Sequence, residues 1–543
     1  MAGGLLNLVA YGNQNVILTG NPTKTFFKCA YAKHTNFGLQ KFRIDYKGSR
    51  LLRTDSSSHF SFTVPRYADM LMDTYLVVTL PHIWSPIVPK GENDTTNHDR
   101  PYEFKWIKHI GTQMIERVRF TIGGQTIQEY TGQYLHNMVE RDFDAAKKEL
   151  YYRMIGHTAE LNDPANAFEN NGDYPNAYYS AETQGPEPSI RSRKLYIPLN
   201  IWFTMAAKMA FPLASLQYNF LHIEIDVRPV RELFVIKDIS TNDENAKPNH
   251  YKANFNDEKE QFHRFLHPPP NPTDTTDSNG VSEKILEYTD KRTDWNADVH
   301  LISTYAFLTE DEVRVFAANS QTYLIKEAYT HTFQNISGPK KIKIDTMGMV
   351  ASWTWFFQRS DSTLRNEWSN YTNWAHDYLP EKIDAPTPTL VPNTLKTTGS
   401  YHFENEKDIM KSWGVLFDGK YRENIMDAGV LNYIDKYARS SGNGPDGQYF
   451  YNFGLRTDPR DFQPTGAINL SKFKDIEFEV DVMSPPMDSN VQTFTVCDDD
   501  NNIIGINKPV WNMYKYTYDL TVMEERYNVL TFMSGNASLM YAR

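Results

Sequence analysis

Apolar and polar residues alternate with a period of two along much of the chain. In the segment LHIEIDV (221–227) every second residue is apolar, and the residues between them are polar. The segments KDIEFEVDV (474–482) and MYKYTYDLTV (513–522) repeat this pattern. A strand with one buried and one solvated face has this period, and β-branched and aromatic residues favour strands. The pattern therefore predicts a protein built from antiparallel sheets.

Turn signals between the apolar runs agree with that fold class. In VRFTIGGQTIQEY (118–130), Gly123 and Gly124 can supply the positive φ angles of a two-residue hairpin turn. A regular hairpin around this turn places Phe120 opposite Ile127.

One segment has a helical pattern, and two long segments have the composition of loops. QYLHNMVERDFDAAKKELYYRMIG (133–156) carries apolar residues at three- and four-residue spacings, which predicts a helix ending before Gly156. Residues 237–297 and 380–400 are polar and rich in Pro. We interpret both as long loops that leave β-sandwiches, because Pro excludes regular pairing and polar residues favour turns.

Composition and charge narrow the class of protein. A chain of 543 residues, 40% of them hydrophobic, can bury more than one core, and two cysteines cannot form a disulfide framework. We expect a protein that is neither secreted nor membrane-spanning, because no signal peptide or long apolar segment is recognisable. The net charge of −11 argues against a bulk nucleic-acid binder.

The charge is unevenly distributed along the chain. Residues 1–53 contain eight Lys and Arg side chains and one acid, Asp45, so this part carries +7 within an acidic protein. Such asymmetry predicts a dedicated partner for the amino-terminal part.

Motifs that carry catalysis or metal binding are weak. HRFLH (263–267) has histidines at helical spacing, but it precedes three prolines, so a solvated loop is favoured over a metal site. CDDDNNIIGIN (497–507) lacks the Gly and the final Glu of a calcium loop and is interpreted as an acidic turn between strands. The paired carboxylates of DEKE (257–260) and of Glu524 and Glu525 are expected on solvated faces.

An aromatic cluster, SWTWFFQRSD (352–361), leaves two interpretations open. The faces of Trp353, Trp355, Phe356 and Phe357 could form a platform for sugar rings. Packing between sheets is favoured, because the two tryptophans alternate with the smaller Thr354, as on a core-facing strand.

Five segments in a fixed order resemble one protein family. GNPTKTFFKCAYAKHTNF (20–37) closely resembles the amino-terminal signature of the major capsid proteins of nucleocytoplasmic large DNA viruses, nearest to those of mimivirus-like giant viruses. The other four segments are FTIGGQTIQ (120–128), FPLASLQYNFLHIEI (211–225), FQPTGAINLSKF (462–473) and YNVLTFMSGNASLMYAR (527–543). They are spread along the chain almost from end to end, and their joint occurrence is more specific than any one of them alone.

The resemblance implies an all-β tandem double jelly roll, two eight-stranded antiparallel β-sandwiches with long loop insertions and a few short helices. It implies a first jelly roll (27–310, including the loop 237–297), a connector (311–319) and a second jelly roll (320–543, including the loop 380–400). The basic charge and the apolar residues of the amino end add the hypothesis of an arm (1–26). Both loops are expected in the outer tower of a capsomer. The structural residues of the family motifs would be Gly20, Asn21, Pro22, Phe26, Phe27, Gly123, Gly124, Gln217, Tyr218, Pro464, Gly466, Gly535, Leu539 and Tyr541.

The function implied by the resemblance is structural. Three chains would form a pseudo-hexagonal capsomer, and capsomers would tile an icosahedral shell, as part of a virion assembled at a viral factory in the host cytoplasm. No catalytic residues, cofactor or metal ligands are assigned, and sequence-specific binding of nucleic acid is not expected. The alternative from another class is a jelly-roll carbohydrate-binding protein or polysaccharide-active enzyme.

Expected partners are further copies of the chain, minor capsid proteins and the inner viral membrane. The arm would lie beneath the capsomer with the basic segment through Arg53 at its base, while Phe26 and Phe27 dock it against the first sandwich. The residues expected to contact partners are Leu5, Leu6, Leu8, Val9, Lys24, Lys28 and Lys33.

Overall fold

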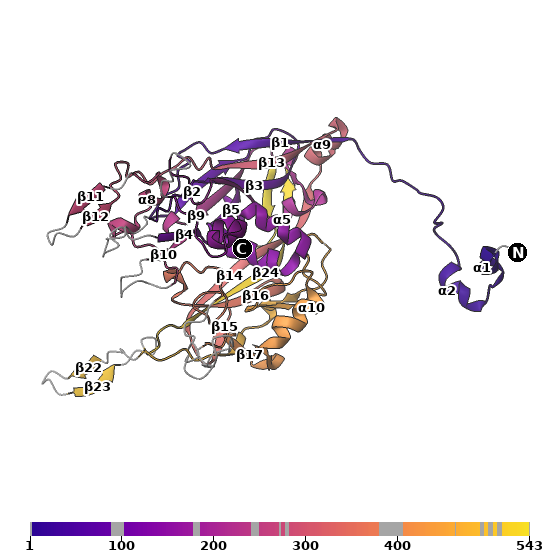
Figure 1. Cartoon of the computed structure of the whole chain (residues 1–543). Coiled ribbons are helices and arrows are strands. Elements are labelled where there is room, and N and C mark those ends of the chain that lie inside the picture. The colour runs from indigo at the N-terminus through magenta and orange to yellow at the C-terminus, as the bar shows by residue number, and fades with distance from the viewer. Residues whose placement is uncertain are drawn as a thin grey trace.

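The structure is a computed structural model of the chain, and Figure 1 shows two β-sandwiches with a long amino-terminal extension. It describes residues 3–87, 102–177, 185–239, 249–270, 273–276, 282–378, 405–461, 463–488, 494–497, 503–507 and 513–541. Within these ranges no helix is long and apolar enough to span a bilayer.

The first sandwich consists of two antiparallel sheets. One sheet has the order β1-β13-β3-β7, with the short β8 (Phe211–Pro212) also paired to β3, and the other has the order β2-β9-β5-β6. The strands are β1 (Phe37–Asp45), β2 (Ser58–Thr63), β3 (Met70–Leu80), β5 (Ile115–Ile122), β6 (Gln125–Tyr130), β7 (Arg193–Pro198), β9 (Leu221–Val227) and β13 (His300–Leu308).

The second sandwich is built in the same way. Its sheets have the orders β14-β24-β16-β19, with β20 (Ile468–Asn469) and β25 (Asn536–Leu539) at the margins, and β15-β21-β17-β18. The strands are β14 (Gln321–Ile336), β15 (Pro339–Lys343), β16 (Met349–Arg359), β17 (Met410–Phe417), β18 (Lys420–Asp427), β19 (Gln448–Asn452), β21 (Ile476–Val482) and β24 (Tyr518–Met533).

The two sandwiches have one topology. When the eight strands of each are counted in chain order, both give a sheet with the order first, eighth, third, sixth and a sheet with the order second, seventh, fourth, fifth. All of these pairs are antiparallel. This arrangement is the double jelly roll that the sequence predicted.

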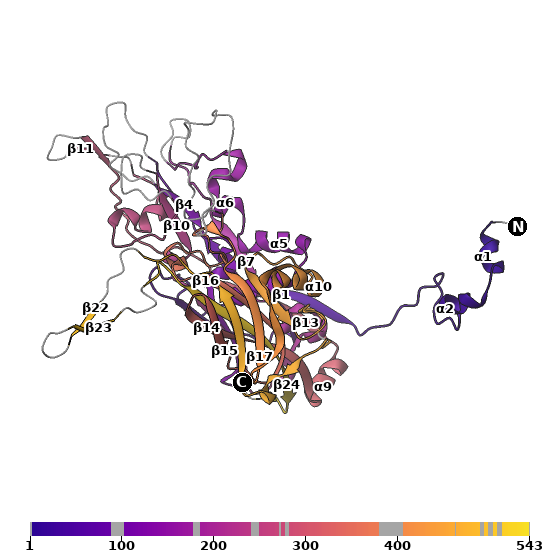
Figure 2. The same ribbon diagram turned by 90° about the horizontal axis from the view of Figure 1, so that it is seen from below.

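Short helices and hairpins connect the two sandwiches and extend from them. The helix α9 (Glu310–Ala318) connects them, and two hairpins, β11 with β12 and β22 with β23, lie at the end of the molecule opposite the amino-terminal extension (Figures 1 and 2). The remaining elements are β4 (Tyr102–Trp106), β10 (Phe234–Asp238), β11 (Thr273–Thr276), β12 (Ser282–Ile285), β22 (Phe494–Cys497), β23 (Ile503–Asn507), α1 (Leu6–Val9), α2 (Val16–Thr19), α3 (Ile110–Gln113), α4 (Gly132–Asp142), α5 (Ala145–Ile155), α6 (Ala159–Asn162), α7 (Trp202–Met205), α8 (His263–Leu266) and α10 (Asp435–Arg439), besides short 3-10 and π-helical turns.

The hairpin of β5 and β6 has the predicted turn but a different register. Gly123 and Gly124 both have positive φ, and Ile122 pairs with Gln125 across them. A β-bulge then shifts the pairing, so Phe120 faces Gln128 and not Ile127. The predicted register was wrong because β6 has one extra residue, Ile127, at the bulge, where Ile127 and its neighbour Gln128 are both buried.

The predicted helix over 133–156 is two helices. The helix α4 ends at Asp142, and the side chain of Asp144 caps the first turn of α5 by accepting the Lys147 amide at 2.7 Å. The N-cap bond explains the break, since Asp at that position favours a new helix start.

The Pro-rich stretch 237–297 was expected to be a polar loop, and part of it is core. Phe262 and Phe265 are buried in the first hydrophobic cluster. His263, expected in a solvated loop, begins the short helix α8 and is 2% exposed. Residues 380–400 lie outside the described residues.

The seam between the jelly rolls and the candidate assembly surfaces

The amino-terminal arm extends away from the sandwiches in both views (Figures 1 and 2). The short helices α1 and α2 lie at its far end, and Leu5, Leu6, Leu8 and Val9 are exposed. Phe26 and Phe27 are also exposed, the latter at 99%. The expectation that these two rings dock the arm on the first sandwich is therefore wrong for the single chain.

The basic residues of the amino-terminal part belong to two groups. Lys24 is exposed on the arm, and Lys28 and Lys33 are exposed between the arm and β1. Arg43 lies on β1 and forms ion pairs with Asp45 and, at 2.5 Å, with Asp298. Asp298 lies just before β13, the strand that pairs with β1, so part of the positive charge near β1 is neutralised within the sandwich. The basic segment that is free to bind a partner is therefore shorter than expected.

Three of the family-like segments meet at one corner of the molecule. The backbone amide of Gln217 donates to the carbonyl oxygen of Gly535 at 3.0 Å. Gly535 has a φ of 81°, and a Cβ there would lie 2.8 Å from the ring of Tyr218. A Cβ at Gly123 would meet Asn219 at 2.9 Å. The close approach of these segments explains why both positions carry glycine.

The remaining motif residues have different surroundings. Leu539 packs against the first core, and the carbonyl of Tyr541 accepts from Asn528 Nδ2 at 3.1 Å. Gly466 has a φ of 147° and approaches Gly454, next to the exposed Pro464. Gly20, Asn21 and Pro22 are exposed on the arm, and Asn21 has a positive φ.

A buried polar network fills the seam between the jelly rolls. Arg141, at the end of α4 in the first jelly roll, donates to Glu525 Oε1 on β24 at 2.8 Å and to Thr354 Oγ1 on β16 at 3.1 Å. The same guanidinium contacts Asp142 at 2.7 Å, and Tyr134 donates its hydroxyl to Glu525 at 3.0 Å. The network therefore ties the first half of the chain to the central strands of the second half.

Electrostatics in this network favour the ion pair of Arg141 with Glu525. Burial raises the pKa of Glu525, but the charges of Arg141 and Lys326 outweigh burial and lower it to about 2. Burial keeps the pKa of Asp142 above its usual range in spite of the same arginine. Buried charges of this kind are tolerated only when they are paired and hydrogen-bonded.

The adjacent Glu524 contradicts the expectation that this pair of glutamates is solvated. Its side chain is completely buried and accepts hydrogen bonds from Trp353 Nε1 at 2.7 Å and Thr346 Oγ1 at 2.6 Å, beside the guanidinium of Arg526. Sequence reasoning missed the burial of this pair because Arg141, which neutralises Glu525, and Trp353 and Thr346, which donate to Glu524, are distant in the sequence.

The aromatic cluster on β16 is core, as the sequence favoured. Trp353, Trp355 and Phe357 are fully buried in the second hydrophobic cluster, and Trp355 stacks on Trp413 with ring centroids 5.0 Å apart. Phe356 faces the other way and stacks on Tyr371 at 4.2 Å within the first cluster. The ring faces are therefore unavailable to a sugar.

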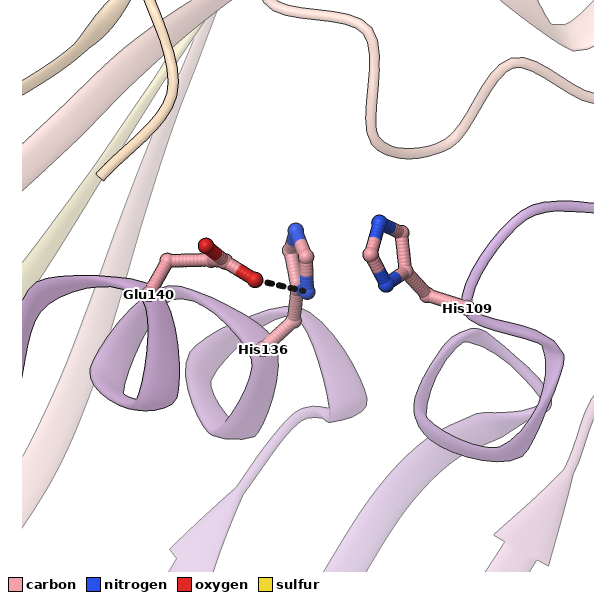
Figure 3. A group of neighbouring side chains, drawn as sticks. All are labelled: His109, His136 and Glu140. Carbon is pink, nitrogen blue, oxygen red and sulfur yellow. Dashed lines mark ion pairs between the residues drawn. The ribbon is translucent and has the colours of Figure 1, made fainter. Parts of the chain in front are cut away.

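A second polar cluster lies beside α4 and is shown in Figure 3. His136 and Glu140 extend from one face of α4. His109, the residue directly before α3, points toward them from the other side. Their potential ligand atoms lie within 4.8 Å of one another. Burial lowers the pKa of both histidines, so the neutral rings are favoured. The spacing of His136 and Glu140, one helical turn, was the only sequence signal for this cluster.

Comparison with known proteins agrees with this architecture. A model of the "major capsid protein N-terminus" matches residues 25–255, and a model of the "large eukaryotic DNA virus major capsid protein" matches residues 312–538. The major capsid protein of Phaeocystis pouchetii virus is 25% identical over the full length of both chains. That of Chrysochromulina ericina virus is 34% identical over 43% of this chain and 42% of its own length.

The fold is also that of a known capsid structure. A quasi-atomic model of the PBCV-1 virus capsid is similar with a TM-score of 0.60 and 17% identity, over 96% of this chain and 100% of that one. Two family models that match successive parts of the chain, the full-length relative and the shared fold lead to one conclusion: the chain belongs to the major capsid proteins of large eukaryotic DNA viruses.

Proposed function

We propose that three copies of this chain form a pseudo-hexagonal capsomer that tiles the icosahedral shell of a large DNA virus. The observation that carries the proposal is the common topology of the two jelly rolls, since three chains with two similar units each supply six units around a threefold axis. Jelly rolls also suit shells because their two sheets leave few long free edges.

The domain division proposed with this function is an arm (1–26), jelly rolls at 27–310 and 320–543, and a connector at 311–319. Its support is that the paired strands of the two sandwiches run from β1 to β13 and from β14 to β24, with α9 between them. The arm and connector carry no buried residues among those described.

We expect the purified chain to be a trimer in solution. Light scattering should give about three times the chain mass of 62.9 kDa at micromolar concentration, because obligate interfaces bury large apolar areas. A stable monomer at that concentration would contradict the capsomer proposal.

The role that we propose is non-catalytic, in a virion assembled at a viral factory in the host cytoplasm. Assembly needs geometry rather than a reacting group, and the buried tryptophans of β16 remove the main support for a carbohydrate-binding protein or polysaccharide-active enzyme. Minor capsid proteins and the anionic inner membrane are the proposed partners of the arm. Exposed Lys24, Lys28 and Lys33 and the apolar residues of α1 support this choice.

Deleting residues 2–20 should leave trimers intact and impair the assembly of shells. Residues 3–20, the described part of this segment, contribute nothing to either core, but they contain the apolar side chains offered to a partner. Sizing of the purified protein and electron microscopy of particles measure the two steps separately.

The matched control keeps the full chain length and changes only the apolar side chains to Ser, at Leu5, Leu6, Leu8 and Val9. It separates the loss of these side chains from the loss of chain length. If the apolar residues matter, it assembles as poorly as the deletion. Normal shells from the deletion variant, with the usual inner partners, would show that the arm is passive.

A further inference from the structure

We propose that His109, His136 and Glu140 form a binding site for one Zn²⁺ ion at the seam between the jelly rolls. The site lies outside the assembly surfaces discussed above, and its proposal does not depend on the oligomeric state. Two imidazoles and one carboxylate are a donor set that suits Zn²⁺, which also accepts a water molecule as a fourth ligand.

The backbone brings the three side chains to one point. His136 and Glu140 are four residues apart on α4, so they share one face, and His136 Nδ1 lies 4.0 Å from Glu140 Oε1. His109 is the residue directly before α3, and its backbone is held in the left-handed region, at a φ of 54°. Ligand atoms within 4.8 Å of one another can reach a common ion by small side-chain rotations.

Two of the ring nitrogens lack the partners that buried nitrogens normally have. Nδ1 of His109 and Nδ1 of His136 are buried, and neither forms a hydrogen bond with any residue that the structure describes, although His136 is only 1% exposed. Buried polar atoms are nearly always satisfied, and unsatisfied ones call for an explanation such as an ion or water. A cavity of about 240 Å³ borders all three side chains, so an ion has room and a path.

The surrounding residues orient the proposed ligands. Tyr152 donates its hydroxyl to Glu140 Oε1 at 2.5 Å, and Lys148 Nζ lies 3.0 Å from Oε2, which fixes the carboxylate beside the rings. Contacts of this kind typically hold metal ligands in place.

His157 supports the site without being a ligand. Its ring stacks on that of His109 with centroids 3.9 Å apart and an interplanar angle of 10°. An ion in the plane of one imidazole cannot lie in the plane of a ring stacked on it. Nδ1 of His157 lies 3.0 Å from Asn162 Nδ2, which holds the His157 ring in place. Through the ring stacking, His157 in turn positions His109.

The test is a zinc titration of the full-length protein, purified without a histidine tag and stripped with a chelator. We expect one Zn²⁺ per chain, and Co²⁺ in place of zinc should give the visible absorption of a tetrahedral site. The variants His136→Gln and Glu140→Gln should bind at least about tenfold more weakly, since even the loss of an outer contact costs about 10–100-fold.

His263→Gln is the matched control, because it removes another buried histidine far along the chain and should retain full binding. A wild-type chain that binds no zinc at micromolar concentration would overturn the proposal. Equal binding by wild type and His136→Gln would also overturn it, by placing the ion elsewhere. Sizing and circular dichroism of each variant show whether weaker binding reflects misfolding. If a variant does not fold, the milder change Glu140→Asp is titrated in its place, and unchanged binding by that folded variant would contradict the proposal.

Discussion

Arg141→Met should lower the free energy of unfolding by about 3–5 kcal/mol, which is the usual cost of leaving buried charges without their partner. Methionine retains much of the length of the side chain but removes every donor. Glu525 and Asp142 would then remain buried without the guanidinium that contacts both. Chemical denaturation, or the apparent melting temperature where unfolding is irreversible, measures the loss.

Arg153→Met on the neighbouring helix α5 is the matched control. Its side chain is 60% exposed and pairs only loosely with Glu149 at 3.5 Å, so we expect a change within about 0.5 kcal/mol. If Arg141→Met were as stable as this control, the seam network would not hold the jelly rolls together.

Trp355→Ala should also cost about 3–5 kcal/mol, the range for truncating a large buried aromatic side chain. The ring is fully buried, stacks on Trp413 and lies between the two sheets of the second jelly roll. A cavity of that size cannot close, because strands on both sides are fixed by their ladders. Thermal unfolding and the yield of trimer measure the effect.

Tyr437→Ala on α10 removes a ring that is 94% exposed and serves as the control for losing an aromatic side chain. We expect no measurable change in the stability of the chain. A Trp355→Ala protein that kept wild-type stability would show that this ring is not part of the core and would reopen the sugar-platform interpretation.

The sequence was sufficient to predict the strands of the sandwiches, because the alternation of apolar and polar residues indicates which face of each strand is buried. In β9 and β21 the buried and less buried residues alternate as LHIEIDV and KDIEFEVDV predicted. The bulge in β6 was not predictable, because the extra residue has no marker comparable to the two glycines of the turn. Strand order required the family resemblance, since periodicity does not tell which strands pair.

The seam was beyond the reach of sequence patterns. Glu524 and Glu525 look like any solvated acidic pair until Arg526 and the distant Arg141 are placed beside them. The burial of His263 was missed for a similar reason. The prolines after it predict an irregular backbone, but they do not indicate which residues pack over the histidine ring. Burial of a polar residue is decided by its partners, and for Glu525 the charged partner, Arg141, comes from the other half of the chain.

The position of β24 has a consequence for how the protein is made. This strand is the last of the eight in its jelly roll to be synthesised, yet it lies between β14 and β16 and carries Glu525. Until residues 518–533 leave the ribosome, the second jelly roll has an open centre and Arg141 of the first has no glutamate opposite it. A chain cut short before β24 therefore lacks a central strand of the second jelly roll and the glutamate that pairs with Arg141 of the first, so only a finished chain closes the seam between them.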